Sequence, residues 1–256
     1  MSKKKKSTKK METPIFSPRP TKRTQIMFIW MFCIVVAIIS GIFITGYLKQ
    51  SNKTSQIILS GLSGNNRVAL TVNIGSSAST QQIVALSNAI TENKIPCTFF
   101  ISKTIAEDLS PIWRAQIMNG NEIDYYYDGS DFNSISDSAI TNSFSQWEAS
   151  VSKNIGSNLS AKYIRADDSY DYKNIYVQTA LYSKNANLIG WTVEFKDMSN
   201  VPEESIKEII NNEIIDGAII KMDISDFNTS KLIKMLSEEA TKKKLKFVNL
   251  NLMFEP

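Results

Sequence analysis

Histidine, the side chain most often used as a catalytic base or metal ligand, does not occur in the 256 residues of this chain. Without histidine, carboxylates are the main side chains that could bind a metal or transfer a proton. They are gathered in two clusters expected in loops: Asp124, Asp128 and Asp131, and then Asp167, Asp168 and Asp171. Carboxylate oxygens are the ligands that Ca²⁺ prefers. The spacing matches no known calcium-binding loop, so the second interpretation is solvated acids with turn-forming roles.

Aromatic side chains form the second set with a recognisable chemistry: Tyr125, Tyr126, Tyr127, Tyr170, Tyr172 and Trp191. Such faces suit sugar rings and could line a glycan-binding cleft. The alternative is core packing, with the tyrosine hydroxyls at the surface. Cys97 lies in an apolar run and is interpreted as an inert core thiol. Cys33 lies in a separate apolar segment, so no disulfide is expected within the main domain.

Strand-like and helix-like segments alternate over most of the chain. The expected strands are residues 68–72, 97–101, 122–126, 162–165, 186–193, 217–222 and 245–250, with 56–59 as a further edge strand. The expected helices are 80–93, 112–118, one capped by Asp137 and running through Val151, 172–183, one opened by Pro202, and 229–243. The alternation predicts one α/β domain built around seven parallel strands.

Seven short words in these segments resemble, in order, those of the polysaccharide deacetylase family, metal-dependent esterases that remove acetyl groups from glycans. The words V-A-L-T-F-D-D-G, A-T-F-F, G-H-E-I-x-x-H and F-R-P-P-Y-G are similar to Val68–Gly75, Cys97–Phe100, Gly120–Tyr126 and Ile164–Ser169. A tryptophan strand, G-x-I-I-L-x-H-D and K-F-V-x-L are similar to Gly190–Val193, Gly217–Asp223 and Lys246–Leu250. The resemblance covers about residues 66–254. It implies a distorted seven-stranded (β/α) barrel with its working residues at the C-terminal ends of strands.

The family holds its metal with one Asp and two His, and it uses a second Asp as base and a late His as acid. At the matching positions this chain has Asn73 for the base, Ile74 for the metal-binding Asp, Tyr126 and Ser130 for the metal-binding His pair, and Asp223 for the late His. The resemblance thus implies a cleft without metal ligands and without a base that could activate water. We expect no metal, no cofactor and no hydrolysis.

Arg165 and Trp191 match residues that the family retains. For Arg165 two interpretations stay open, a contact to carboxylate or glycan and an ion pair with Asp223 or Asp167. Trp191 is a candidate either for a glycan contact or for the core.

Charge is divided unevenly along the chain. Residues 1–25 hold nine Lys and Arg against one Glu, a charge of +8, so the total of +4 leaves about −4 for residues 26–256. A nucleic-acid interface needs basic charge on a folded domain, so we expect no nucleic-acid partner.

Residues 26–48 contain no charged side chain, and their 23 positions would form a helix of roughly 34 Å, long enough for a bilayer core of about 30 Å. A cleaved signal peptide is the alternative, but its apolar region is shorter. We therefore expect a transmembrane helix at 26–48, a cytoplasmic basic tail at 1–25, a polar linker at 49–66 and an extracytoplasmic domain at 67–256.

The sequence thus predicts a membrane-anchored pseudoenzyme that binds cell-wall glycan or an envelope protein without hydrolysis. The first alternative is a structural partner of an envelope-assembly complex, in which the cleft is vestigial. The second is a divergent deacetylase that acts on C–N bonds through other residues.

Overall fold

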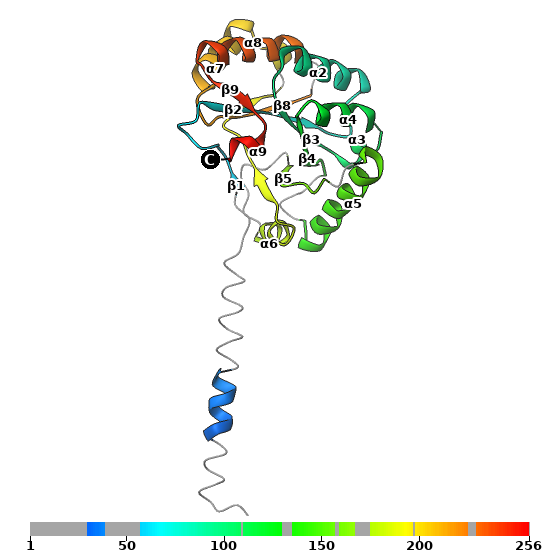
Figure 1. The fold of residues 1–256 in the computed structure, drawn as a ribbon, viewed down its shortest axis with the longest axis vertical. Helices are drawn as coiled ribbons and strands as arrows, with labels where there is room; N and C mark the ends of the chain where they lie inside the picture. The colour runs from blue at the N-terminus through cyan, green and yellow to red at the C-terminus, as the bar shows by residue number, and fades with distance from the viewer. Residues whose placement is uncertain are drawn as a thin grey trace, which may run out of the picture. The chain divides into compact units, whose positions relative to one another are not determined.

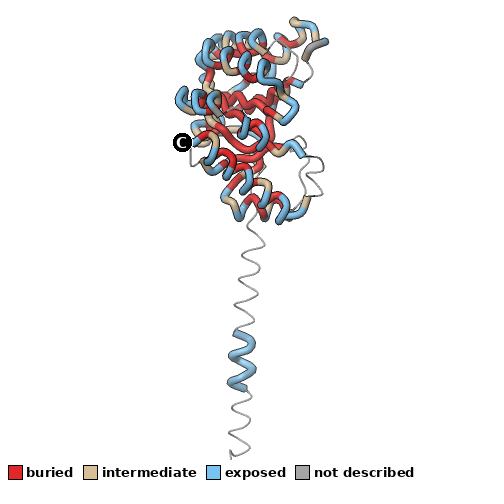
Figure 2. The backbone as a smooth tube through the Cα atoms, turned by 90° about the vertical axis from the view of Figure 1, so that its right-hand side faces the viewer, coloured by how far each residue is buried: buried red, intermediate tan, exposed pale blue. Residues whose placement is uncertain are grey.

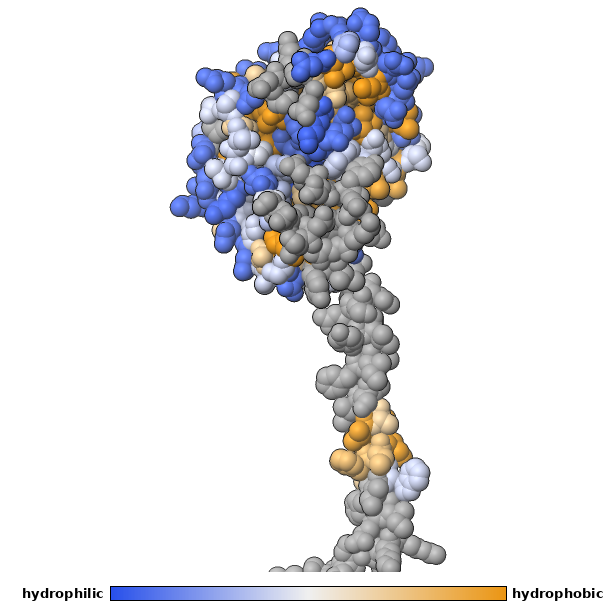
Figure 3. Space-filling model, turned by 180° about the vertical axis from the view of Figure 1, so that it is seen from behind, coloured by the Kyte–Doolittle hydropathy of each residue, from blue (hydrophilic) through white to orange (hydrophobic). Residues whose placement is uncertain are grey.

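The computed structural model describes residues 30–38, 57–108, 110–129, 135–156, 159–166, 175–196, 198–224 and 229–255. The chain divides into two compact units, Met1–Asn52 and Lys53–Pro256. In the first unit, residues 30–38 are helical, and apolar side chains cover the face seen in Figure 3. No helix in the described ranges is long and apolar enough to cross a membrane. The rest of the predicted span at 26–48, and the basic tail at 1–25, lie outside those ranges.

The second unit is built on a parallel sheet, and Figure 1 shows helices along most of its outer side. Its nine strands within the described residues are β1 Ile57–Ile58, β2 Arg67–Ile74, β3 Cys97–Ile101, β4 Glu122–Tyr127, β5 Tyr163–Ala166, β6 Asn187–Ile189, β7 Val193–Phe195, β8 Ile219–Asp223 and β9 Lys246–Val248. Their order is β1-β6-β5-β4-β3-β2-β8-β7, with β9 beside β2. Every pairing is parallel. The predicted α/β architecture is confirmed.

The helices follow the expected apolar periodicity. They are α2 Thr80–Asn93, α3 Lys103–Asp108, α4 Ser110–Met118, α5 Asp137–Ile155, α6 Ile175–Ser183, α7 Glu203–Glu213, α8 Thr229–Lys242 and α9 Leu250–Met253, with a 3₁₀ turn, η3, at Met198–Asn200. In α2 the buried residues Ile83, Leu86, Ala89 and Ile90 recur every three or four positions, which gives the helix one apolar face. Figure 2 shows that the strands are buried in the interior and that the helices, which are exposed on one side, pack around them.

Side chains on successive strand residues point to opposite faces, so the sheet has two cores. An outer cluster packs between sheet and helices, and β2 contributes Val68, Leu70, Val72 and Ile74 to it. An inner cluster fills the inside of the curved sheet: Ala69, Phe100, Tyr126, Tyr163, Ile189, Trp191, Ile219, Leu250 and Met253. Its last two members come from α9, so this short helix packs against the inside of the sheet, where the Leu250 N–H donates to Thr98 Oγ1 near the start of β3 at 2.9 Å.

The prediction of seven strands is wrong, because the segment expected as one strand at 186–193 forms two. β6 pairs with β5 and β1, whereas β7 pairs with β8 near the other edge of the sheet. The three residues between them cross from edge to edge. The Gly190 N–H donates to Ile58 O at 2.8 Å, and the Thr192 N–H donates to Ile219 O at 2.9 Å. These bonds close the sheet into an incomplete barrel.

Two smaller predictions are also corrected. Ser136, not Asp137, caps α5, since its hydroxyl accepts the Ala139 N–H at 3.3 Å while Asp137 lies in the first turn. The strand expected at 245–250 ends at Val248, because Asn249 caps α9 by accepting the Leu252 N–H at 3.0 Å.

Candidate functional site

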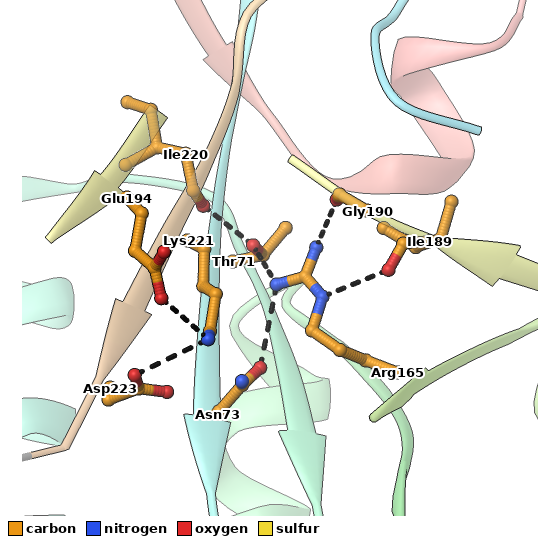
Figure 4. A network of polar contacts seen from close by, with 9 residues as sticks. All are labelled: Thr71, Asn73, Arg165, Ile189, Gly190, Glu194, Ile220, Lys221 and Asp223. Carbon is orange, nitrogen blue, oxygen red and sulfur yellow. Dashed lines mark hydrogen bonds and ion pairs between the residues drawn. The ribbon is translucent and has the colours of Figure 1, made fainter. Parts of the chain in front are cut away.

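All strands of a parallel barrel end on the same side, here called the mouth. A polar network lies inside the barrel near the mouth, on β2, β5, β7 and β8 (Figure 4). Arg165 is at its centre and is fully buried. Its guanidinium donates to Thr71 Oγ1 at 2.5 Å, to Gly190 O at 2.8 Å, to Ile189 O at 3.3 Å and to Asn73 Oδ1 at 3.5 Å.

These four partners of Arg165 are neutral oxygens. The ion pair expected with Asp223 is not formed, although the Asp223 charge acts on the guanidinium from further away. Asp167, the other expected partner, lies outside the described residues. Burial lowers the pKa of Arg165 to about 9, with Asp223 opposing the shift, so the side chain is a cation at neutral pH.

Lys221 is a site residue that the sequence analysis did not identify. It lies on β8 with 1% of its surface exposed. Its ammonium is 2.8 Å from Glu194 Oε1, 3.5 Å from Asp223 Oδ2 and 4.3 Å from the centre of the Trp191 ring. A signal was present in the sequence, because Lys221 interrupts an apolar strand where the family word has leucine.

Asn73 lies at the end of β2 and is 2% exposed. Its Oδ1 accepts from Arg165, but its Nδ2 is buried without a hydrogen-bond partner. Its neighbour in the β2–β8 register is Asp223, whose side chain is 23% exposed. The structure thus places the positions of the family's base and late His side by side.

The other predicted site residues are distributed differently. Ile74 packs in the outer cluster, on the opposite face of β2 from Asn73. Tyr126 and Trp191 belong to the inner cluster and are 5% and 7% exposed. Ser130 lies outside the described residues. The network therefore brings together Asn73, Arg165, Trp191 and Asp223, but not Ile74.

The carboxylate cluster expected near Asp124 does not form as predicted. Asp124 lies within β4, 2% exposed, and its Oδ1 accepts the backbone N–H groups of Lys162 and Tyr163 at 3.0 and 3.2 Å. Burial raises its pKa well above the ordinary value, and the charge of Glu122 adds to the shift. Asp128 accepts the Ser76 N–H at 2.9 Å. Asp131, Asp167, Asp168 and Asp171 are outside the described ranges.

Among the tyrosines expected in the cleft, Tyr125 is a core residue. Its ring lies 5.7 Å from that of Phe144 and 5.6 Å from that of Trp147, and its hydroxyl is 2.5 Å from Ser143 Oγ. Burial raises the pKa of Tyr125 to about 12. Tyr170 and Tyr172 lie outside the described residues.

The residues present do not fit the metal that the fold family implies. Within the described ranges no three His, Cys, Asp or Glu side chains are grouped to hold an ion. The amide oxygen of Asn73 already accepts from a cation, and Ile74 has no donor atom. Two buried cations, Arg165 and Lys221, would also repel a divalent ion at the mouth.

Comparison with known proteins gives a likeness in structure only. No family model and no curated protein matches the sequence. A peptidoglycan N-acetylglucosamine deacetylase matches with a TM-score of 0.69 and 17% identity, over 82% of this chain and 96% of that one. A CE4 family pseudoenzyme from Bacillus anthracis gives 0.68 and 14%, over 79% and 70%. The chitin deacetylase of the fungal pathogen Colletotrichum lindemuthianum gives 0.67 and 20%, over 78% and 92%. At these identities the likeness concerns the fold, and the chain has the polysaccharide deacetylase fold.

Proposed function

We propose that this chain is a membrane-anchored, extracytoplasmic protein that uses the deacetylase fold to bind cell-wall glycan without hydrolysing it. The observation that carries the proposal is the contact between Arg165 and Asn73. Hydrolysis at this position would need a carboxylate to take a proton from water. A carboxamide whose oxygen accepts from a buried guanidinium cannot serve as that base.

The position of the family's acid supports the same proposal. Asp223 stands at the position of the family's late His, and its carboxylate lies 3.5 Å from the Lys221 ammonium. This contact directs the carboxylate toward a buried cation and not toward a leaving amine. Base and acid are thus both replaced by groups tied to buried cations.

The polar groups that remain are suited to holding a ligand. Asn73 Nδ2 is a buried donor with no partner, and Glu194 and Asp223 present carboxylates that are 33% and 23% exposed. Sugar hydroxyls both donate and accept hydrogen bonds. The same fold occurs in a protein described as a CE4 family pseudoenzyme, of which one mutant is described as having restored enzymatic activity.

The test uses the full-length protein in detergent with three measurements. Acetate release from acetylated chitooligosaccharides and peptidoglycan should be at background, and dialysed protein should hold well under one transition metal per chain. The protein should sediment with insoluble peptidoglycan. Acetate release that Asp223→Asn abolishes would support an active deacetylase instead, and failure to bind any wall glycan would leave the structural-partner function.

The anchor is tested separately. In wall-stripped intact cells, added protease should degrade the domain at 67–256 and spare the basic tail at 1–25. A protected domain, or a mature protein that lacks residues 1–48, would contradict the proposed topology.

A further inference from the structure

The orientation of the Asn73 side chain is fixed by its surroundings. Oδ1 accepts from the Arg165 guanidinium at 3.5 Å. Turning the amide over would point its N–H groups at a cation, which has no acceptor. Nδ2 must therefore point away from Arg165, and Figure 4 shows it on the side of Lys221 and Asp223.

Nδ2 of Asn73 is buried and has no hydrogen-bond partner. Nearly all buried polar groups in folded proteins are satisfied by protein, ordered water or ligand. A buried donor at the mouth of a barrel, with its amide locked in place, is therefore a ready contact for an acceptor atom.

A hydrogen-bond acceptor, the Asp223 carboxylate, lies next to this donor. Asn73 and Asp223 are partners in the β2–β8 register, and neighbouring strands lie about 4.8 Å apart. Two hydrogen bonds of about 2.8 Å can bridge side chains on such strands through a single oxygen atom. The Asp223 carboxylate is held toward the site by Lys221 and is partly open to solvent.

The charges around the pair balance. Arg165 and Lys221 are cations and Glu194 and Asp223 are carboxylates, so the network has no net charge. A charged ligand group would gain little here, whereas a group that both accepts and donates would satisfy both side chains.

We infer that Asn73 and Asp223 together bind one hydroxyl group of a neutral carbohydrate: its oxygen accepts from Asn73 Nδ2, and its hydrogen is donated to the Asp223 carboxylate. This inference rests on the proposed glycan binding and names the contact that makes it. Arg165 and Lys221 act as positioning residues, since each holds one member of the pair.

The experiment is titration calorimetry of the full-length protein in detergent with an N-acetylated chitooligosaccharide and with soluble peptidoglycan strands. The variant Asn73→Asp keeps the shape and the bond to Arg165, but it replaces the unpartnered donor by an acceptor beside Asp223. It should weaken binding about tenfold or more. The control Asn93→Asp makes the same change of atom and charge at the end of α2 and should bind like the wild type.

The outcomes separate the two ideas. If the wild type binds and both variants bind equally well, the Asn73 amide does not contact the glycan and the inference is wrong, while the proposed function stands. If the wild type binds neither glycan, the proposed function itself fails. Asp223→Asn keeps the shape of the side chain but removes its negative charge. Its amide oxygen is a weaker hydrogen-bond acceptor than a carboxylate, so this variant should also weaken binding. Thermal melts confirm that each variant is folded.

Discussion

The Lys221 ammonium lies over the face of Trp191, 4.3 Å from the centre of the ring. On the same indole, Arg165 Cζ lies 5.7 Å from the ring centre, so both buried cations of the mouth contact one aromatic side chain. Trp191 is 7% exposed and belongs to the inner cluster. It therefore supports the network and leaves little of its face for stacking on a sugar.

We expect Trp191→Ala to lower the free energy of unfolding by about 3–5 kcal/mol, because a large buried ring is lost beside two cations. Urea denaturation followed by circular dichroism measures the change. Tyr182→Ala, which removes an aromatic residue that is 43% exposed on α6, should cost under about 1 kcal/mol and is the control. A folded Trp191→Ala protein of wild-type stability that has lost glycan binding would instead make Trp191 a ligand contact.

Arg165 should not be replaceable by lysine. Its planar guanidinium reaches Thr71, Ile189 and Gly190 at once, whereas an ammonium on a shorter stem cannot. Carbonyl groups left buried without a donor should cost about 3 kcal/mol in total. The matched control is Arg114→Lys, whose guanidinium donates to Ile155 O and Asn154 O near the surface. Water can replace those bonds, so equal losses in the two variants would contradict the central role of Arg165.

Much of the architecture could be predicted from local patterns. The bounds of α2 and β3 match the expectation because apolar periodicity and strand-forming runs are local properties. Once a parallel barrel is assumed, Asn73, Arg165 and Asp223 must meet, since the ends of parallel strands lie together. The resemblance in seven short words supplied that assumption.

The features that were missed depend on partners distant in sequence. Lys221 is an isolated cation in an apolar run, and its partner Glu194 is 27 residues earlier on a strand that was not expected to be separate. Nothing local in 186–193 indicates that the chain leaves one edge of the sheet and joins the other. The buried position of Asp124 could not be predicted either, because the backbone N–H groups of Lys162 and Tyr163 that donate to its carboxylate come next to it only in the folded chain.

Asp124 predicts a pH dependence of stability. Burial and Glu122 raise its pKa in the folded state, whereas Lys162 and the two backbone N–H groups act in the opposite direction. Between the ordinary value near 3.9 and the raised one, the folded chain binds more protons than the unfolded chain. The contribution of Asp124 to stability must therefore fall as pH rises through that window.

The measurement compares wild type and Asp124→Asn by urea denaturation from pH 4 to pH 7. As pH rises, the free energy of unfolding of the variant should increase relative to that of the wild type, by up to about 1.4 kcal/mol for each unit of pH within the window. Asp108→Asn, an exposed acid on α3, should show no such trend. The opposite result, a wild type whose free energy of unfolding increases relative to that of Asp124→Asn as pH rises, would contradict the prediction. It would mean that hydrogen bonds stabilise the ionised carboxylate by more than burial destabilises it.

The final prediction concerns the metal that the fold family uses. Asn73→Asp, Ile74→Asp, Tyr126→His and Ser130→His together would supply the family's side-chain types, although Ile74→Asp places a carboxylate in the outer cluster and should reduce stability. These four changes leave Lys221 in place, and its ammonium would repel Zn²⁺ across a site of low dielectric constant.

We therefore expect the fourfold variant to bind Zn²⁺ weakly and the same variant with Lys221→Leu to bind it roughly 10–100-fold more tightly. Leucine is the residue of the family word at this position. The substitution would leave Glu194 and Asp223 without the Lys221 ammonium, but water can hydrate both carboxylates because they are 33% and 23% exposed. Zinc titration with a fluorescent competitor measures affinity without relying on activity. Adding Lys207→Leu instead, which removes an exposed lysine on α7, should change little. Equal zinc affinity with and without Lys221 would show that the missing donors alone exclude the metal.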